Sequence, residues 1–190
     1  RIYEGTNEIN RMLLVGMLLK KGLKGELDLM EAVLKSKKDI NDIGSYEQKK
    51  DFGEEKQLLK NLKNVFLLLL GASVEKFGPK IEEKQQVLLS LSDMVIEIYL
   101  SESAILRTQK NSIKGDDQNI QIMMTKLYLF EAVEIILKKA KEIIPSISIP
   151  GKTEDLKKNI EKLCTYNIPN VIDLKTKIAD KIISENKYCF

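Results

Sequence analysis

Hydrophobic residues recur at helical spacing along almost the whole chain. They return every three or four positions over long stretches, and the strict alternation that is typical of half-buried strands is absent. Glycine, proline and polar stretches separate these segments. The pattern predicts helices over about 6–21, 28–37, 54–78, 80–110, a stretch containing 123–137 that stops before Pro145, and then 153–165 and 170–185. The polar stretch 38–53 is predicted to be a loop or connector.

The expected helix ends carry local signals. Lys20 and Lys21 form a basic last turn before Gly22, a residue type that commonly stops a helix. Gly78 and Pro79 are predicted to end the helix over 54–78. Thr153 and Asn170 are predicted N-caps, because short polar side chains accept hydrogen bonds from the first amides of a helix.

The predicted helices have apolar faces that suit a helical bundle. The first helix carries apolar residues at roughly helical spacing, namely Ile9, Met12, Leu13, Met17 and Leu19. The helix over 54–78 has a single apolar stripe, namely Leu58, Leu62, Val65, Phe66, Leu69 and Ala72. Long helices joined by short turns predict an all-α fold, an antiparallel bundle of the up-and-down type.

Composition removes several function classes. The 190 residues include 31 Lys plus Arg and 28 Asp plus Glu, and a net charge of +3 is too mild to indicate a nucleic-acid partner. The most apolar run, 65–70, is far too short to span a membrane. With no His and two distant cysteines, Cys164 and Cys189, we expect no His-based triad, no Cys/His metal site and no disulfide framework. Because Arg1 is not Met, we interpret it as an internal cut in a longer protein.

The first eleven residues carry the candidate chemistry. An aromatic residue and a carboxylate, Tyr3 and Glu4, precede Gly5, and small polar residues then open a helix. Glycine lets the backbone approach a ligand closely, and the free amides of a helix start suit an anion or a pyrophosphate. The same arrangement also begins helices that have no ligand, so the pattern alone leaves both interpretations open.

The run Ile-Tyr-Glu-Gly-Thr-Asn-Glu-Ile, followed by Arg11, resembles the signature near the end of the catalytic region of flavin-dependent acyl-CoA dehydrogenases. A weaker resemblance, which includes Asp93 to Tyr99 and the terminal Asn-Lys-Tyr-Cys-Phe, extends to the extra helical domain of the very-long-chain branch. It implies three parts: residues 1–22 as the last helix of the catalytic domain, 23–53 as a connector, and 54–190 as the extra helical domain.

The resemblance also implies roles for individual residues. Glu4 matches the catalytic base, which removes the α-proton of a fatty acyl-CoA while the β-hydrogen leaves as hydride to FAD. Tyr3 and Gly5 match positions beside the acyl-CoA, although an aromatic at such a junction also suits a core. The positions that contact FAD are matched by Thr6, Asn7 and Glu8.

For the whole protein, the resemblance implies an enzyme of fatty acid β-oxidation that forms trans-2-enoyl-CoA, passes electrons to electron-transfer flavoprotein and forms a homodimer. We expect these 190 residues alone to be inactive. The expected location is the bacterial cytoplasm, with the mitochondrial matrix or inner-membrane surface as alternatives. The resemblance also implies membrane association, because very-long-chain relatives contact a membrane surface through the segment after the first helix of the extra domain. The corresponding residues here, 31–52, include five Lys and five acids, and this zero net charge does not favour binding to a membrane surface. The alternative function is a non-catalytic helical interaction or assembly module.

Overall fold

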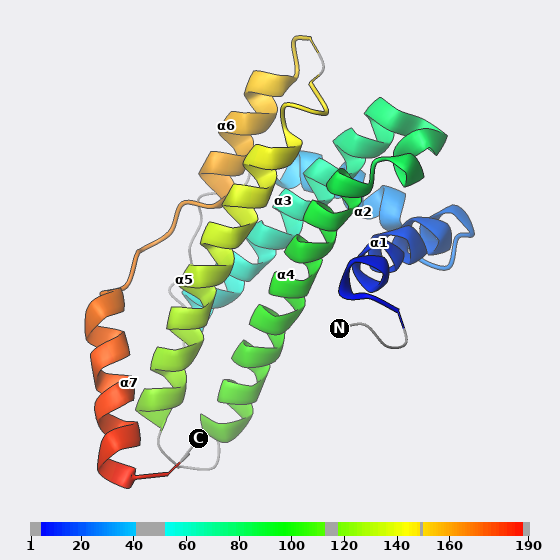
Figure 1. Ribbon diagram of the computed structural model, residues 1–190. Coiled ribbons are helices and arrows are strands. Elements are labelled where there is room, and N and C mark those ends of the chain that lie inside the picture. The colour runs from blue at the N-terminus through cyan, green and yellow to red at the C-terminus, as the bar shows by residue number, and fades with distance from the viewer. Residues whose placement is uncertain (1–4, 41–51, 113–117, 149, 188–190) are drawn as a thin grey trace.

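The computed structural model describes residues 5–40, 52–112, 118–148 and 150–187, and the regular structure in these ranges is helical (Figure 1). The predicted all-α fold is confirmed. The α-helices are α1 (Asn7–Leu23), α2 (Leu29–Asp39), α3 (Gly53–Phe77), α4 (Gln85–Ser112), α5 (Gln118–Ile143), α6 (Thr153–Leu163) and α7 (Val171–Glu185), with a 3-10 segment, η2 (Gly78–Glu83), between α3 and α4.

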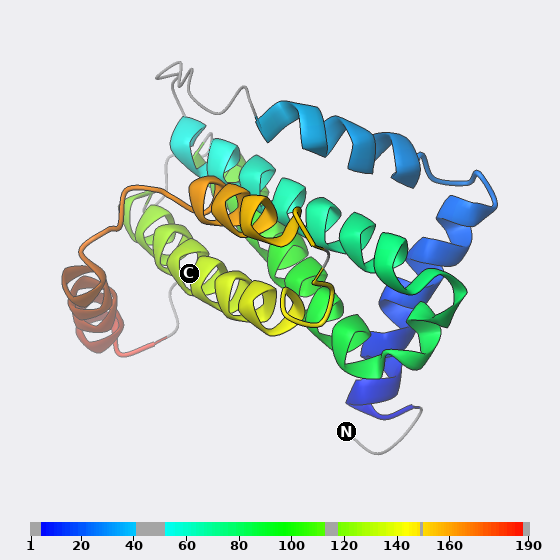
Figure 2. The same cartoon turned by 90° about the horizontal axis from the view of Figure 1, so that it is seen from above.

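Three long antiparallel helices, α3, α4 and α5, form the body of the molecule, and the other helices pack around them (Figures 1 and 2). Helix α2 lies along α3, α1 crosses α4, α6 packs on α3 and α5, and α7 packs on α5. The core lies between the long helices. Its completely buried side chains include Leu62, Leu69, Leu91 and Ile136. Burial of this apolar surface is the main contribution to the stability of such a bundle.

Helix α1 ends in a glycine turn, but at a different glycine from the one predicted. Gly22 lies inside the helix, where a Cβ atom would stand 3.0 Å from the Cβ and Cδ2 atoms of Leu29. Gly25, with φ of +71°, takes the left-handed position. Its amide donates to the carbonyl of Gly22, and the amide of Glu26 donates to that of Lys21. This is the Schellman arrangement, so Gly22 allows close packing on α2 and Gly25 stops the helix.

The segment between α3 and α4 also differs from the prediction of a helix over 80–110. Gly78 and Pro79 end α3 as expected, but the chain then forms η2, and α4 begins only at Gln85. Ile81 is buried at 5% exposure. The 3-10 segment therefore places one apolar side chain in the core while the chain reverses direction, which the 3.6-residue periodicity did not show.

Of the two predicted caps, one is confirmed. The Asn170 side chain accepts a hydrogen bond from the amide of Asp173 at 3.2 Å and caps α7. Thr153 was wrongly predicted as the cap of α6, because the N-cap is Lys152 and Thr153 is the first helical residue. The Thr153 hydroxyl lies 3.4 Å from that of Ser148, so it joins the preceding turn.

The predicted apolar faces are confirmed in the centre of the bundle and fail at its edge. In α3 the predicted stripe is buried apart from Ala72, which is half-buried. In α1, three of the five predicted apolar positions, Ile9, Leu13 and Met17, are 46%, 53% and 56% exposed, and the other two are half-buried. The completely buried residue of this helix is Val15, which was not among the predicted positions. Helix α1 thus has an apolar outer face, defined here as Ile9, Leu13 and Met17, opposite the side that packs on α4.

Among the described residues, no helix combines the length and the apolar character that a membrane crossing requires.

Candidate functional site

The start of α1 is built by a glycine and a cap. Gly5 has φ of +95°, and a Cβ atom there would lie 2.9 Å from the Asn10 Oδ1 atom. A side chain is therefore disfavoured at Gly5 by the backbone conformation, and it would also displace the Asn10 side chain. The Thr6 Oγ1 atom accepts a hydrogen bond from the amide of Ile9 at 3.3 Å, which caps the helix. The signature residues thus fold into a turn followed by a capped helix.

The structure places four of the six predicted site residues together. Gly5, Thr6, Asn7 and Glu8 follow one another at this helix end, and all four are exposed. The two predicted residues that precede them, Tyr3 and Glu4, lie outside the described residues, so their roles stay predictions. The Thr6 hydroxyl is used as the cap, while the side chains of Asn7 and Glu8 are accessible to a ligand.

These residues suit the edge of a flavin site better than a complete one. The first amides of a helix lack acceptors within the helix and carry partial positive charge, so they bind polar or anionic groups. Here they stand beside the exposed polar side chains of Asn7 and Glu8. The residues present at the start of α1 therefore fit contact with FAD along one edge.

A group of charged side chains fastens this helix to the bundle. Arg11 forms an ion pair through its Nη2 atom with Oδ1 of Asp93 on α4. The other oxygen, Oδ2 of Asp93, lies 3.4 Å from the Lys139 Nζ atom on α5. Lys139 also contacts Glu142 at 3.0 Å, and the Ser90 hydroxyl donates to Glu142 at 3.1 Å. We call these five residues the α1 clamp.

Contacts within the clamp shift the pKa of two of its members. The pKa of Glu142 is lowered mainly by its hydrogen bond with Lys139, and the hydrogen bond from Ser90 lowers it further. Burial lowers the pKa of Lys139, but the carboxylates of Glu142 and Asp93 outweigh that effect and raise it above its ordinary value. Both groups therefore stay charged at neutral pH. Sequence reasoning placed Arg11 in the signature and Asp93 in the weaker resemblance, but it missed their contact, because helical periodicity carries no signal for a pair so distant in the chain.

A separate cavity lies elsewhere on the bundle. Its volume is about 780 Å³, and it is open to solvent between the start of α3, helix α5 and the segment 165–169. The Tyr166 hydroxyl is buried without a hydrogen-bond partner among the described residues. Burial, followed by the carboxylate of Glu134, raises the pKa of Tyr166 to about 12. The cavity shares no lining residue with the start of α1 or the clamp.

Two sequence comparisons match this chain to known proteins, one over residues 61–160 and one over almost its whole length. The family described as "Acyl-CoA dehydrogenase, C-terminal domain" matches residues 61–160, which span most of α3 through most of α6. A probable acyl-CoA dehydrogenase of Bacillus subtilis (strain 168) is 32% identical over 191 aligned positions, which cover 99% of this chain and 32% of that protein.

A solved structure shares the fold over the whole chain. The crystal structure of an acyl-CoA dehydrogenase complexed with FAD from Bacillus anthracis superposes with a TM-score of 0.94 at 30% identity, covering 100% of this chain and 33% of that one. The chain therefore spans about a third of the length of these relatives. By the family match over more than half of its residues, the chain belongs to the acyl-CoA dehydrogenase family.

Proposed function

We propose that this chain is the C-terminal part of an FAD-dependent acyl-CoA dehydrogenase of the very-long-chain branch, which converts a fatty acyl-CoA to trans-2-enoyl-CoA in β-oxidation. One observation carries the proposal. The described signature residues, Gly5 to Glu8, form an exposed, capped helix start, and every part of this chain aligns with an FAD-complexed dehydrogenase.

The apolar outer face of α1 supports the same interpretation. Ile9, Leu13 and Met17 lie one turn apart on one side of the helix and are about half exposed. A row of large apolar side chains on a helix surface is typical of a face that another part of a larger assembly covers. In the proposal, the remainder of the dehydrogenase covers this face and completes the active site.

Each signature residue has a proposed task. Glu4 removes the α-proton of the acyl-CoA, since a positioned carboxylate is a suitable general base. Gly5 lets the thioester approach the backbone closely, and Tyr3 forms an aromatic wall beside it. Thr6, Asn7 and Glu8 hold the edge of the flavin. FAD, when bound, supplies the acceptor for the hydride that leaves the β-carbon.

The remaining parts of the proposal concern the whole protein. Residues 1–22 belong to the catalytic domain, 23–53 connect, and 54–190 form an extra helical domain. The complete enzyme forms a homodimer, passes electrons to electron-transfer flavoprotein and works in the bacterial cytoplasm. Because most of the flavin site lies outside these 190 residues in the proposal, the chain alone neither retains FAD nor turns over acyl-CoA.

Anaerobic titration of the complete protein with palmitoyl-CoA tests this function. We expect the oxidised flavin absorbance to bleach in the wild type. Glu4→Gln should retain flavin but lose bleaching by at least about a hundredfold in rate, because a general base contributes roughly that much. Glu83→Gln, at an exposed glutamate after Ile81, is the matched control and should bleach normally.

Two outcomes would contradict the proposal. A complete protein that binds no flavin, or whose flavin never bleaches with any acyl-CoA, would favour the helical interaction module. Undiminished bleaching in Glu4→Gln would leave the enzyme in place and remove Glu4 as its base.

A further inference from the structure

Two neighbouring residues of α4 hold one residue of α1 from both sides. The Ser92 hydroxyl donates a hydrogen bond to the main-chain oxygen of Arg11, and Asp93 pairs with the Arg11 guanidinium. Ser92 is completely buried, and the side chains of Arg11 and Asp93 are only 23% and 20% exposed. Because both the main chain and the side chain of Arg11 are bonded to α4, the position of α1 along its axis and its rotation about that axis are fixed at this residue.

Asp93 is itself held in place. One of its carboxylate oxygens forms the ion pair with Arg11, and the other lies 3.4 Å from the Lys139 Nζ atom on α5. Asp93, which belongs to α4, therefore contacts both α1 and α5. The Lys139 Nζ atom also forms an ion pair with the Oε2 atom of Glu142, at 3.0 Å. The Nε atom of Arg11 is buried without an acceptor among the described residues. Among the described residues Asp93 is the acidic partner of Arg11, and an uncompensated, partly buried guanidinium is costly.

The distance along α1 makes this contact relevant to the helix start. Arg11 lies in the second turn of α1, and Val15, one turn further on, is completely buried. The residues before Arg11, from Gly5 to Asn10, are all exposed. Arg11 is thus the described anchor nearest to the signature turn. Thr6 accepts a hydrogen bond from the amide of Ile9, and the Asn10 side chain donates to the carbonyl of Gly5 at 3.4 Å, so a shift of α1 at Arg11 moves Gly5 and Thr6 with it.

We propose that Asp93 is a positioning residue, which sets the place of the signature turn at the start of α1 through Arg11. This inference rests on the proposed function, because it assigns the turn to the reacting site. It gives the bundle a task in the reaction, which is exerted through the placement of α1. A displacement of about 1 Å at reacting groups lowers rates strongly, so the effect reaches catalysis.

An ion pair elsewhere on the same helix provides a matched control. Lys63 of α3 and Glu102 of α4 are 2.7 Å apart, and each side chain is 42% exposed. This pair also joins two helices, but it does not involve α1. Exposed pairs of this kind contribute little to stability. Glu102→Gln therefore removes one acidic charge from α4, as Asp93→Asn does, without touching the clamp.

The experiment compares Asp93→Asn, Asp93→Glu and Glu102→Gln in the complete protein. Amide hydrogen exchange followed by mass spectrometry reports local opening of each helix. In Asp93→Asn we expect α1 peptides to exchange about tenfold faster or more, while α3 and α5 peptides keep their rates. Asp93→Glu, which keeps the charge, should recover part of the protection, and Glu102→Gln should leave α1 unchanged.

Flavin reduction by palmitoyl-CoA gives the second measurement. We expect Asp93→Asn to lower the reduction rate about tenfold with flavin content and acyl-CoA affinity almost unchanged, and Asp93→Glu to restore part of the rate. Unchanged α1 exchange in Asp93→Asn would overturn the inference. So would faster α1 exchange with an unchanged reduction rate, or an equal effect of Glu102→Gln. If the wild-type flavin is not reduced at all, the proposed function fails, and the exchange data alone still decide whether Asp93 anchors the helix.

Discussion

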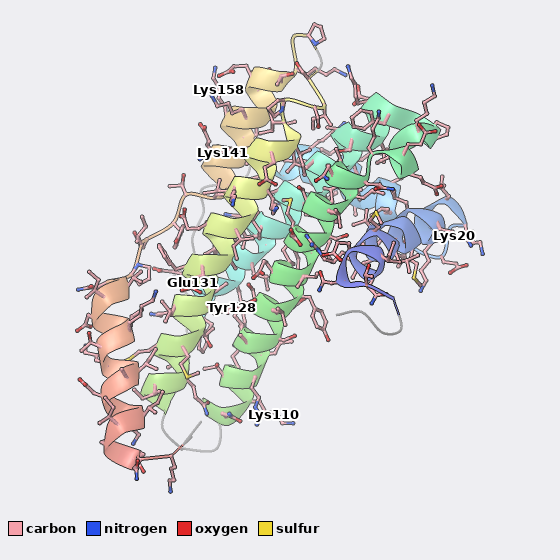
Figure 3. The ribbon with its side chains drawn as sticks, viewed as in Figure 1. Lys20, Lys110, Tyr128, Glu131, Lys141 and Lys158 are labelled. Carbon is pink, nitrogen blue, oxygen red and sulfur yellow. The ribbon has the colours of Figure 1, made fainter. Side chains whose placement is uncertain are left out.

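Helices α1 and α7 both lie outside the three-helix body, but they are attached in different ways (Figures 1 and 2). Helix α1 inserts Val15 completely into the core and is clamped at Arg11. Helix α7 has no buried residue. It packs on α5, where Lys175 lies 3.4 Å from Glu131, labelled in Figure 3, and both side chains are more than half exposed.

The interactions that hold the two helices differ in range along the chain. Besides its exposed contacts with α5, helix α7 has local interactions, namely the Asn170 cap and the pairs Lys177 with Asp173 and Lys181 with Glu185. The contacts of α1 come from residues far away in the sequence. Local interactions form a helix, and only the distant ones place it precisely. In the proposed function α1 carries the signature turn, and its distant contacts are the ones that would place that turn.

The largest difference should follow from removing one buried side chain. Val15→Ala removes two methyl groups from a closed site in α1 and should lower the free energy of unfolding by about 2 kcal/mol. The matched change in α7 is Val171→Ala, at a half-buried position. It should cost less than about 1 kcal/mol, because the site is open to water. Urea denaturation measures both, and equal losses would contradict the contrast.

A smaller effect is expected from the two N-caps, which make the same hydrogen bond. Thr6 and Asn170 each accept from the amide three residues ahead, at 3.3 Å and 3.2 Å. Replacement by Ala should cost about 1 kcal/mol of helix stability in each case.

The difference should lie in how far the loss spreads. In Thr6→Ala, faster amide exchange should stop before Val15, whereas in Asn170→Ala it should extend through α7. Hydrogen exchange at the level of single amides would measure this. Fraying of α1 beyond Val15 would show that its anchors are weaker than the structure indicates.

The smallest effect is expected at Cys164, which follows α6 and precedes the segment leading to α7. It is 5% exposed, and burial raises the pKa of its thiol to about 12, with a further contribution from Glu134. Because the thiolate is the reactive form, a Cys189→Ser protein should react slowly with a thiol reagent at neutral pH and faster as pH rises toward that value. Adding Asn170→Ala should leave the rate unchanged. Faster labelling would mean that loosening α7 also opens the core.

Sequence reasoning succeeded where a signal is local. The positions of the helices, the Asn170 cap and the stop before Pro145 all follow from spacing and residue type within a few positions. The apolar stripe of α3 was predictable because the helix lies in the centre of the bundle, where every apolar face finds a partner. The signature at the start of α1 was recognised for the same reason, since its residues are contiguous.

Sequence reasoning failed where the outcome depends on how separate helices pack on one another. Gly22 has the residue type of a helix stop, but the side chain of Leu29 requires it as a packing position. Leu106 is a large apolar residue within the helix predicted over 80–110, but it is 58% exposed, since no described helix covers it. Periodicity reports that a side chain is apolar, and it does not report which face has a partner.

The amino-acid sequence by itself determined the all-helical fold, the approximate helix limits and the signature that identifies the family. These depend on hydrogen bonds and spacing within single segments. Only the tertiary structure decided that α1 has one buried and one exposed apolar face, and that Arg11 meets Ser92 and Asp93. The physical reason is that packing joins residues from separate helices, and their geometry exists only after the helices have assembled.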